Sequence, residues 1–138
     1  DLEIIVADAN NMPIREEAIT KVCLIHSIGH IYKPSNALNE LNRILKKEGE
    51  IVITTPNKRH ISIMRPFNRL GIIRYEPDPT VLEYFNKNEL SKIVKESGFK
   101  IDKILEYGQL PKILNVVRFL KRLNEFRLRI IIKAIKPF

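Results

Sequence analysis

Glycine and cysteine are scarce in this chain of 138 residues, and each shortage excludes a class of site. The five glycines lie far apart, so the sequence contains no G-x-G-x-x-G loop of the kind that cradles phosphates or dinucleotides. The single cysteine, Cys23, excludes an internal disulfide and a zinc site built from cysteines, and it favours a reducing, cytoplasmic location. No apolar run approaches the roughly 20 residues that a membrane span needs.

Positive charge is concentrated in two segments. The formal net charge is +8, to which residues 58–75 contribute +5 and residues 109–138 contribute +7. The remaining residues are slightly acidic in sum. Blocks of one sign indicate an anionic partner, and the alternative is a solvated basic surface in a chain rich in lysine.

Apolar periodicity predicts alternating strands and helices. Runs of strand length, rich in β-branched residues, occupy 2–7, 20–25, 50–55, 99–105 and 128–135. Helical spacing of apolar residues occurs over 34–49, 86–98 and 110–124, the first with Lys46 and Lys47 in its last turn and Gly49 as C-cap. This alternation predicts an α/β domain with a largely parallel sheet.

Residues 56–85 interrupt the alternation. They show no clear period and contain four prolines, and a segment of about 30 residues without a period is typical of a lid or a binding loop. Asn86 and Glu89 then have the spacing of a capping box at a helix start. We therefore expect one domain over 1–138, with a lid-like insertion at 56–85 and an amphipathic helix at 110–124.

Six segments follow one another in the order of a known family. They are Asp8–Ile14, Lys21–Ile31, Ala37–Gly49, Ile51–Asn57, Tyr84–Phe99 and Ile130–Pro137. Together they resemble the carboxyl-terminal half of class I methyltransferases that use S-adenosylmethionine (SAM) and act on small molecules. The resemblance implies a truncated Rossmann-like sheet, mostly parallel with an antiparallel last strand, and helices on both faces. The family's glycine-loop half is absent, so the chain is expected to begin in the middle of the domain.

The resemblance also implies a cofactor site. The carboxylate of Asp8 would accept a hydrogen bond from the adenine amino group of SAM, and Met12 would pack on the base. The alternative is that Asp8 only forms a turn, as aspartate often does. The residues implied for the cofactor are Asp8, Ala9, Asn10, Met12, Ile25 and His26.

His30 matches the second of two histidines that often follow the family's fourth strand. It is the candidate catalytic residue, because an imidazole orients a substrate or accepts a proton near neutral pH. The alternative is a loop histidine that packs or bonds to solvent. The spacing of His26 and His30 is that of half a metal site, but no H-E-x-x-H motif is present and no metal is expected.

The basic segments are predicted to meet. If the strands are parallel, the insertion and the amphipathic helix both leave carboxyl ends of strands, the edge at which open α/β sheets bind ligands. We predict a basic rim there that docks an anionic substrate, which includes a phosphorylated metabolite, RNA and an anionic lipid surface. The alternative is a solvated face. The residues of this rim are Arg59, Arg65, Arg69, Arg74, Arg118, Lys121 and Arg122.

The run at 2–7 lacks neighbours. It corresponds to the third strand of a family whose sheet order is 3-2-1-4-5-7-6, and the two missing strands leave a gap of roughly 14 Å. We expect the run to pair directly beside residues 20–25, with contact between two copies of the chain. The alternatives are that a second copy covers the edge or that a separate chain supplies the amino-terminal half.

The sequence thus predicts a methyltransferase-type domain that transfers the methyl group of SAM to a small acceptor, with an anionic one favoured by the basic segments. A non-catalytic remnant that serves as a binding module or partner subunit is the first alternative. A protein that binds or modifies RNA through the basic rim is the second. Enzymatic activity stays open, because the glycine loop is missing.

Overall fold

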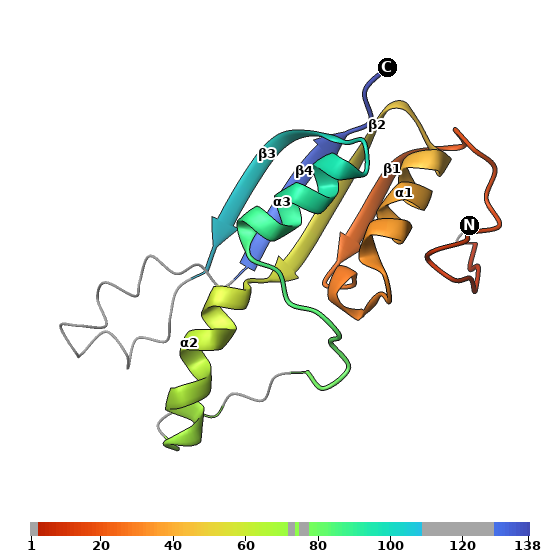
Figure 1. Cartoon of the computed structure of the whole chain (residues 1–138). Coiled ribbons are helices and arrows are strands. Elements are labelled where there is room, and N and C mark those ends of the chain that lie inside the picture. The colour runs from red at the N-terminus through yellow and green to blue at the C-terminus, as the bar shows by residue number, and fades with distance from the viewer. Residues whose placement is uncertain (1–2, 72–73, 75–77, 109–128) are drawn as a thin grey trace.

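The computed structural model describes residues 3–71, 74, 78–108 and 129–138 (Figure 1). Its strands are β1 (Ile19–Ile25), β2 (Leu45–Pro56), β3 (Lys100–Tyr107) and β4 (Arg129–Ile135). Its helices are α1 (Pro34–Ile44), α2 (Lys58–Arg69), α3 (Lys87–Glu96) and the short 3-10 helix η1 (Ile28–His30). None of these helices is both long and apolar enough to cross a membrane.

The strands form one mixed sheet in the order β1-β2-β4-β3. β1 pairs with β2 in parallel, while β4 runs antiparallel to both β2 and β3. This is the order expected for the family's fourth, fifth, seventh and sixth strands, and the predicted α/β fold with an antiparallel last strand is confirmed. α1 and α3 lie on the same face of the sheet, and α2 extends from the carboxyl end of β2 (Figure 1).

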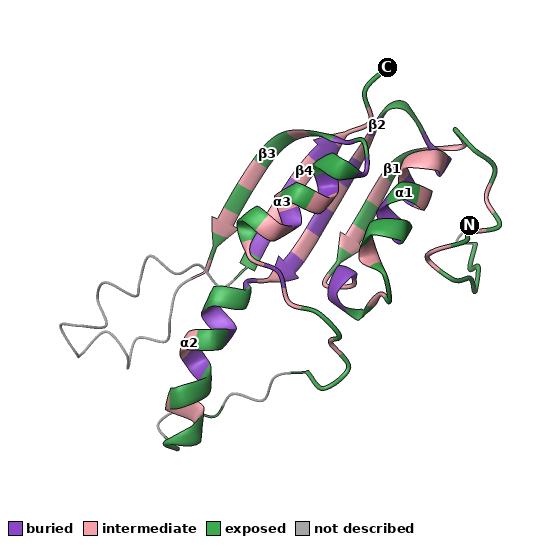
Figure 2. Cartoon of the chain, viewed as in Figure 1, coloured by how far each residue is buried: buried purple, intermediate pink, exposed green. Residues whose placement is uncertain are grey.

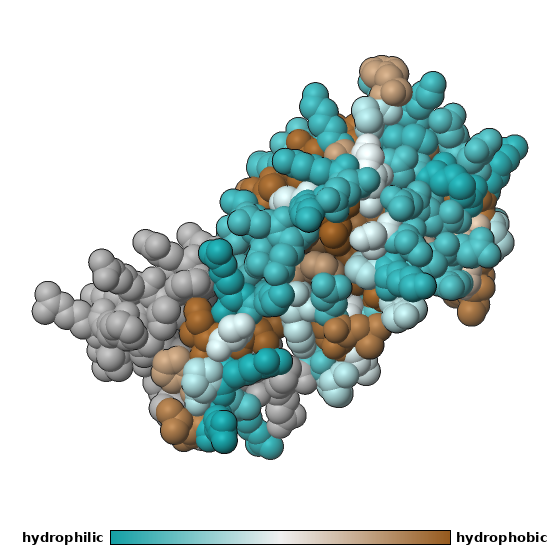
Figure 3. Space-filling model, in the orientation of Figure 1, coloured by the Kyte–Doolittle hydropathy of each residue, from teal (hydrophilic) through white to brown (hydrophobic). Residues whose placement is uncertain are grey.

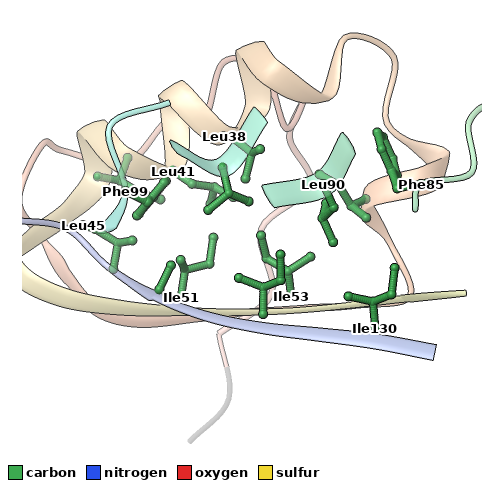
Figure 4. Packing of buried hydrophobic residues seen from close by; sticks show 14 residues of the cluster. Leu38, Leu41, Leu45, Ile51, Ile53, Phe85, Leu90, Phe99 and Ile130 are labelled. Carbon is green, nitrogen blue, oxygen red and sulfur yellow. The ribbon is translucent and has the colours of Figure 1, made fainter. Parts of the chain in front are cut away.

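The core lies between the sheet and the two helices α1 and α3. From Gly49 in β2 and from Ile130 in β4, residues alternate between buried and half-buried, as expected when one face of a strand packs against a core (Figure 2). In Figure 4, side chains from the helices point toward side chains of the sheet. The outward surface of α1 and α3 is mainly hydrophilic (Figure 3). The buried cluster contains Ile28, Leu38, Leu41, Ile44, Leu45, Ile51, Ile53, Phe85, Leu90, Val94, Phe99, Ile130, Ile132 and Ala134.

The predicted end of the first helix is wrong. α1 ends at Ile44, and the lysines assigned to its last turn belong to β2. The carbonyl of Leu45 accepts a hydrogen bond from Lys136 Nζ at 2.8 Å, and Glu48 N donates to the carbonyl of Lys136 at 3.0 Å. Gly49 is therefore no helix cap. A Cβ there would lie 2.7 Å from the carbonyl oxygen of Lys46, so the glycine permits a close approach of backbone to backbone.

The insertion contains a helix that periodicity did not indicate. α2 begins after Asn57, whose side chain caps it by accepting a hydrogen bond from Arg59 N at 3.1 Å. Ile61 and Met64 are the buried apolar residues of α2. The helical signal is weak because Pro66 lies inside the helix and basic residues occupy much of the rest.

The start of α3 agrees with the sequence. Asn86 Oδ1 accepts hydrogen bonds from Asn88 N and Glu89 N, both at 2.9 Å. Glu89 Oε2 accepts one from Asn86 N at 2.9 Å. The predicted capping box is confirmed, and it fixes the point at which the chain re-enters the core after the insertion.

The predicted first strand and its pairing beside residues 20–25 are wrong for the described residues. Residues 3–7 form no strand, and Ile4 and Val6 are 83% and 96% exposed. An apolar run becomes a strand only where a neighbour takes up its backbone hydrogen bonds. The nearest described pairing is an isolated bridge between Asp8 and Asn11. The predicted helix at 110–124 lies outside the described residues.

Candidate functional site

A pocket of about 270 Å³ lies at the carboxyl ends of β1 and β2. His26 directly follows β1, while Thr55 and Pro56 end β2, so one wall comes from the edge at which open α/β sheets bind ligands. The opposite wall comes from residues 78–84 of the insertion. The structure thus brings both predicted histidines to one cavity. Its lining is His26, Gly29, His30, Thr55, Pro56, Asp78, Val81 and Tyr84.

His26 is held by its backbone. Its φ of 53° lies in the left-handed region, and its N–H donates to the carbonyl oxygen of Thr54 at 3.0 Å and to Thr54 Oγ1 at 3.1 Å. Burial lowers the pKa of the imidazole, and the charge of Arg129 lowers it further. The neutral ring is therefore favoured in the pocket.

Gly29 joins the insertion to the loop after β1. Its carbonyl oxygen accepts hydrogen bonds from Leu82 N at 2.8 Å and from Glu83 N at 3.1 Å. A Cβ on Gly29 would lie 2.7 Å from the carbonyl oxygen of Glu83 and 3.2 Å from Val81 Cγ1. The two backbones approach so closely that glycine is required, and this contact closes the pocket on the side of the insertion.

His30 contacts two polar residues of the insertion. Its Nδ1 lies 3.0 Å from Thr80 Oγ1, and its Nε2 lies 3.9 Å from Asp78 Oδ2. The Thr80 hydroxyl donates to Asp78 Oδ1 at 2.7 Å. Hydrogen bonds from the side chain and then the backbone of Thr80 lower the pKa of Asp78, and the nearby His30 adds to the effect. Neither residue was predicted as part of the site, although aspartate and threonine two positions apart are a signal for a local turn.

Asp8 forms a turn at the surface. Its Oδ1 accepts hydrogen bonds from Asn10 N at 2.9 Å and from Asn10 Nδ2 at 3.0 Å. The first of these and then the second lower the pKa of the Asp8 carboxyl. Asn10 Nδ2 also donates to the carbonyl of Tyr32 at 3.0 Å, which ties the turn to the residues after η1. Asp8 is therefore an exposed, ionised acceptor as well as a turn residue.

The segment that carries Asp8 is anchored on α1 by an ion pair. Arg43 Nη2 and Glu40 Oε1 lie 2.7 Å apart, and Glu40 Oε1 also accepts a hydrogen bond from Met12 N at 2.8 Å. Arg43 Nη2 donates to the carbonyl of Ile14 at 2.8 Å. The Arg43 guanidinium first and the Met12 amide second lower the pKa of Glu40 to about 2. This pair fixes the position of the candidate cofactor segment.

The ion pair predicts a pH dependence of stability. Because the pKa of Glu40 is lowered in the folded chain, its contribution is present above the ordinary value of 4.5 and is lost as the pH falls toward about 2. Urea denaturation across this range is expected to show stability decreasing with pH, and Glu40→Gln is expected to flatten the decrease. Glu96→Gln, at an exposed pair with Lys92, is the control and should keep the slope. Equal slopes for the wild-type chain and Glu40→Gln would contradict the assignment.

The predicted rim residues lie apart from the histidine pocket. Arg59, Arg65 and Arg69 are on α2, beyond the carboxyl end of β2 (Figure 1). Arg59 lines a second pocket of about 210 Å³ together with Glu106 and the first residues of α3. Arg74 is exposed, whereas Arg118, Lys121 and Arg122 lie outside the described residues. The described arginines thus share one end of the sheet with the histidines without lining their pocket.

The family follows from a comparison with known proteins. Residues 6–104 match the methyltransferase domain family. The chain belongs to this family. It is 27% identical over 118 residues to the ubiquinone/menaquinone biosynthesis C-methyltransferase UbiE of Campylobacter jejuni, an alignment that covers 73% of this chain and 50% of the relative. The chain thus spans about half the length of the curated relatives it matches.

Solved methyltransferases share the fold. A structure of a methyltransferase from Bacillus halodurans superposes with a TM-score of 0.70 at 18% identity, over 99% of this chain and 78% of that one. A SAM-dependent methyltransferase from Archaeoglobus fulgidus gives 0.69 at 19% identity, over 96% and 66%. The methyltransferase in the Haloferax volcanii complex with the activator Trm112 gives 0.68 at 12% identity, over 97% and 60%. These likenesses show the Rossmann-like methyltransferase fold. Membership of the methyltransferase domain family supports SAM as the cofactor.

The residues of this chain fit part of that cofactor. Asp8 is ionised, exposed and able to accept a hydrogen bond from an exocyclic amine such as that of adenine. The glycine loop that would face the rest of the cofactor is absent from the sequence. The histidine pocket, at about 270 Å³, lies just below the ~300–1,000 Å³ typical of ligand sites. Among the described residues, Asp8 thus offers one ionised acceptor of the kind that the base end of SAM requires, and the histidine pocket has room for a small ligand.

Proposed function

We propose that this chain forms the acceptor side of a SAM-dependent methyltransferase that acts on a small molecule. The observation that carries the proposal is the pocket at the carboxyl ends of β1 and β2, lined by His26 and His30, in a chain whose residues 6–104 match the methyltransferase domain. Small-molecule C-methylation by the Campylobacter jejuni relative supports the acceptor class.

SAM, when bound, supplies a methyl group on a positively charged sulfur. The chain's own residues then have three tasks, which are to hold the acceptor, to exclude water and to take up the acceptor's proton. Asp8, with Ala9, Asn10 and Met12, would hold the adenine, and Ile25 and His26 would face the cofactor. His30 is the proposed proton acceptor, since its ring lines the pocket.

An anionic acceptor is supported by charge. Arg59, Arg65 and Arg69 carry positive charge on α2 at the end of the sheet that holds the pocket. With Arg118, Lys121 and Arg122 they would raise the local concentration of an anion near the site. The same charges also support the second alternative, in which RNA is the acceptor. Substrate binding that does not weaken with rising salt concentration would contradict both the anionic small molecule and RNA as acceptors.

A non-catalytic binding module is the competing function. For either function we propose a reducing, cytoplasmic location, which the single cysteine favours. It is supported by the exposed apolar residues Ile4, Ile5 and Val6, which are 83%, 58% and 96% exposed. Apolar groups exposed together are typical of surfaces that bind another chain. The solved Haloferax volcanii methyltransferase is in a complex with an activator protein. For this chain, the proposed partner is a second copy or a separate chain that supplies the amino-terminal half.

Calorimetric titration with S-adenosylhomocysteine and SAM separates these functions. We expect saturable binding to the chain, and Asp8→Ala should weaken it at least about tenfold, the loss typical of one charge-assisted hydrogen bond. Asp102→Ala removes a half-exposed carboxylate on β3 and is the matched control. Equal binding by Asp8→Ala would contradict the cofactor role of Asp8. The absence of binding would contradict a working cofactor site in this chain alone and favour the non-catalytic module or an obligate partner chain.

A further inference from the structure

The contacts of His30 fix where its protons lie. The Thr80 hydroxyl has one proton, and the Asp78 carboxylate, when ionised, only accepts hydrogen bonds. At 2.7 Å from Asp78 Oδ1, the hydroxyl donates its proton to that oxygen. Thr80 Oγ1 is then an acceptor toward His30 Nδ1, 3.0 Å away. His30 must therefore carry a proton on Nδ1.

We propose that Asp78 and Thr80 are positioning residues that hold His30 as its Nδ1–H tautomer and leave Nε2 as the proton-accepting atom in the pocket. The hydrogen-bond chain runs from His30 Nδ1–H to Thr80 Oγ1–H to Asp78 Oδ1. The tautomer stands on these contacts alone. The use of Nε2 in methyl transfer rests on the proposed function.

The geometry also stabilises the proton once it has moved. When the acceptor loses its proton to His30 Nε2, the ring becomes an imidazolium with Nδ1–H retained, and Nε2 lies 3.9 Å from Asp78 Oδ2. Asp78 stays ionised, in keeping with its lowered pKa. His26 and Tyr84 also line the pocket, and burial favours the neutral ring of His26. Asp78 is therefore the carboxylate that balances the charge formed on His30.

The pair is held in place without the help of His30. Thr80 N donates to Asp78 Oδ1 at 2.9 Å, which closes the local turn. Two residues further on, the amides of Leu82 and Glu83 bond to the carbonyl of Gly29. The acceptor for Nδ1–H is thus set by the backbone of the insertion, and the ring is oriented before any ligand arrives.

The test is the ¹⁵N NMR spectrum of the imidazole nitrogens in the full chain, taken at a pH at which the rings are neutral. The wild-type chain should show the Nδ1–H form of His30 in excess. Thr80→Val removes the hydroxyl at nearly constant volume and should lower the ratio of the Nδ1–H to the Nε2–H form about fivefold, the effect of losing one typical hydrogen bond. Thr80→Ser keeps the hydroxyl and should retain the wild-type ratio. The His26 signals serve as the internal control.

Asp78→Ala gives a second arm. With both carboxylate oxygens removed, the Thr80 hydroxyl loses the acceptor for its proton and is free to donate to Nδ1, so the ratio should move in the same direction as in Thr80→Val. An unchanged ratio in Thr80→Val with an otherwise native amide spectrum, or a loss in Thr80→Ser equal to that in Thr80→Val, would overturn the proposal. The readout needs neither cofactor nor turnover, so a failure to bind S-adenosylhomocysteine would overturn the proposed function and leave the tautomer result standing.

Discussion

Replacing Ile132 by alanine is expected to lower the free energy of unfolding by about 2–5 kcal/mol, the range for a large aliphatic residue removed from a core. Ile132 is fully buried and lies on β4, between the two strands that β4 joins. Its neighbours in register are Ile53 on β2 and Ile104 on β3. The cavity left by its side chain would open in the middle of the sheet, where the surrounding backbone is least free to collapse.

The adjacent residue is the matched control. Ile131 is chemically identical, but its side chain points to the opposite face of β4 and is only half-buried. Ile131→Ala is expected to cost less than half as much as Ile132→Ala in urea denaturation. Equal losses would mean that both faces of β4 are packed to the same degree, contrary to the structure.

Gly29→Ala is expected to separate the insertion from the loop after β1. The added Cβ would lie 2.7 Å from the carbonyl oxygen of Glu83, a contact that only a backbone shift relieves. Overpacking of this kind typically costs about 1–3 kcal/mol. The amide protons of Leu82 and Glu83, which bond to Gly29, should then exchange faster with solvent, and hydrogen-exchange NMR measures this directly.

Gly71→Ala is the control that tests whether adding a methyl group to any glycine of the insertion accelerates amide exchange at Leu82 and Glu83. No atom lies within 4 Å of a Cβ at Gly71, so its cost is confined to its positive φ of 70°. Exchange at Leu82 and Glu83 should be the same as in the wild-type chain. If Gly71→Ala accelerates exchange there, or Gly29→Ala does not, the close approach at Gly29 is not what holds the insertion.

The sheet was largely predictable because its strands carry their own pattern. The apolar runs at 20–25 and 128–135 became β1 and β4, and the Asn86–Glu89 spacing marked the start of α3. The strand order came from the family resemblance, since periodicity alone does not order strands. The run at 2–7 has a strand pattern too, but a pattern supplies no neighbour, and residues 3–7 remain unpaired in the described structure.

The site was predictable only in part. His26 and His30 follow β1 directly, so the resemblance to the family's fourth strand placed them. Asp78 and Thr80 lie far along the chain, in an insertion that has no period. Their contact with His30 depends on two backbone hydrogen bonds to Gly29, and nothing in the local sequence reports that pairing. Tertiary contacts made by backbone atoms leave no residue pattern to read.

The position of β4 has a consequence for synthesis on the ribosome. β4 is the most carboxyl-terminal of the described strands, yet it lies inside the sheet, and among those strands β3 pairs with β4 alone. Until residues 129–135 emerge from the exit tunnel, β3 lacks its strand partner and β2 presents an open edge. Folding of this region therefore waits for β4, and a nascent chain stalled before residue 129 exposes two unpaired edges to chaperones and to neighbouring chains.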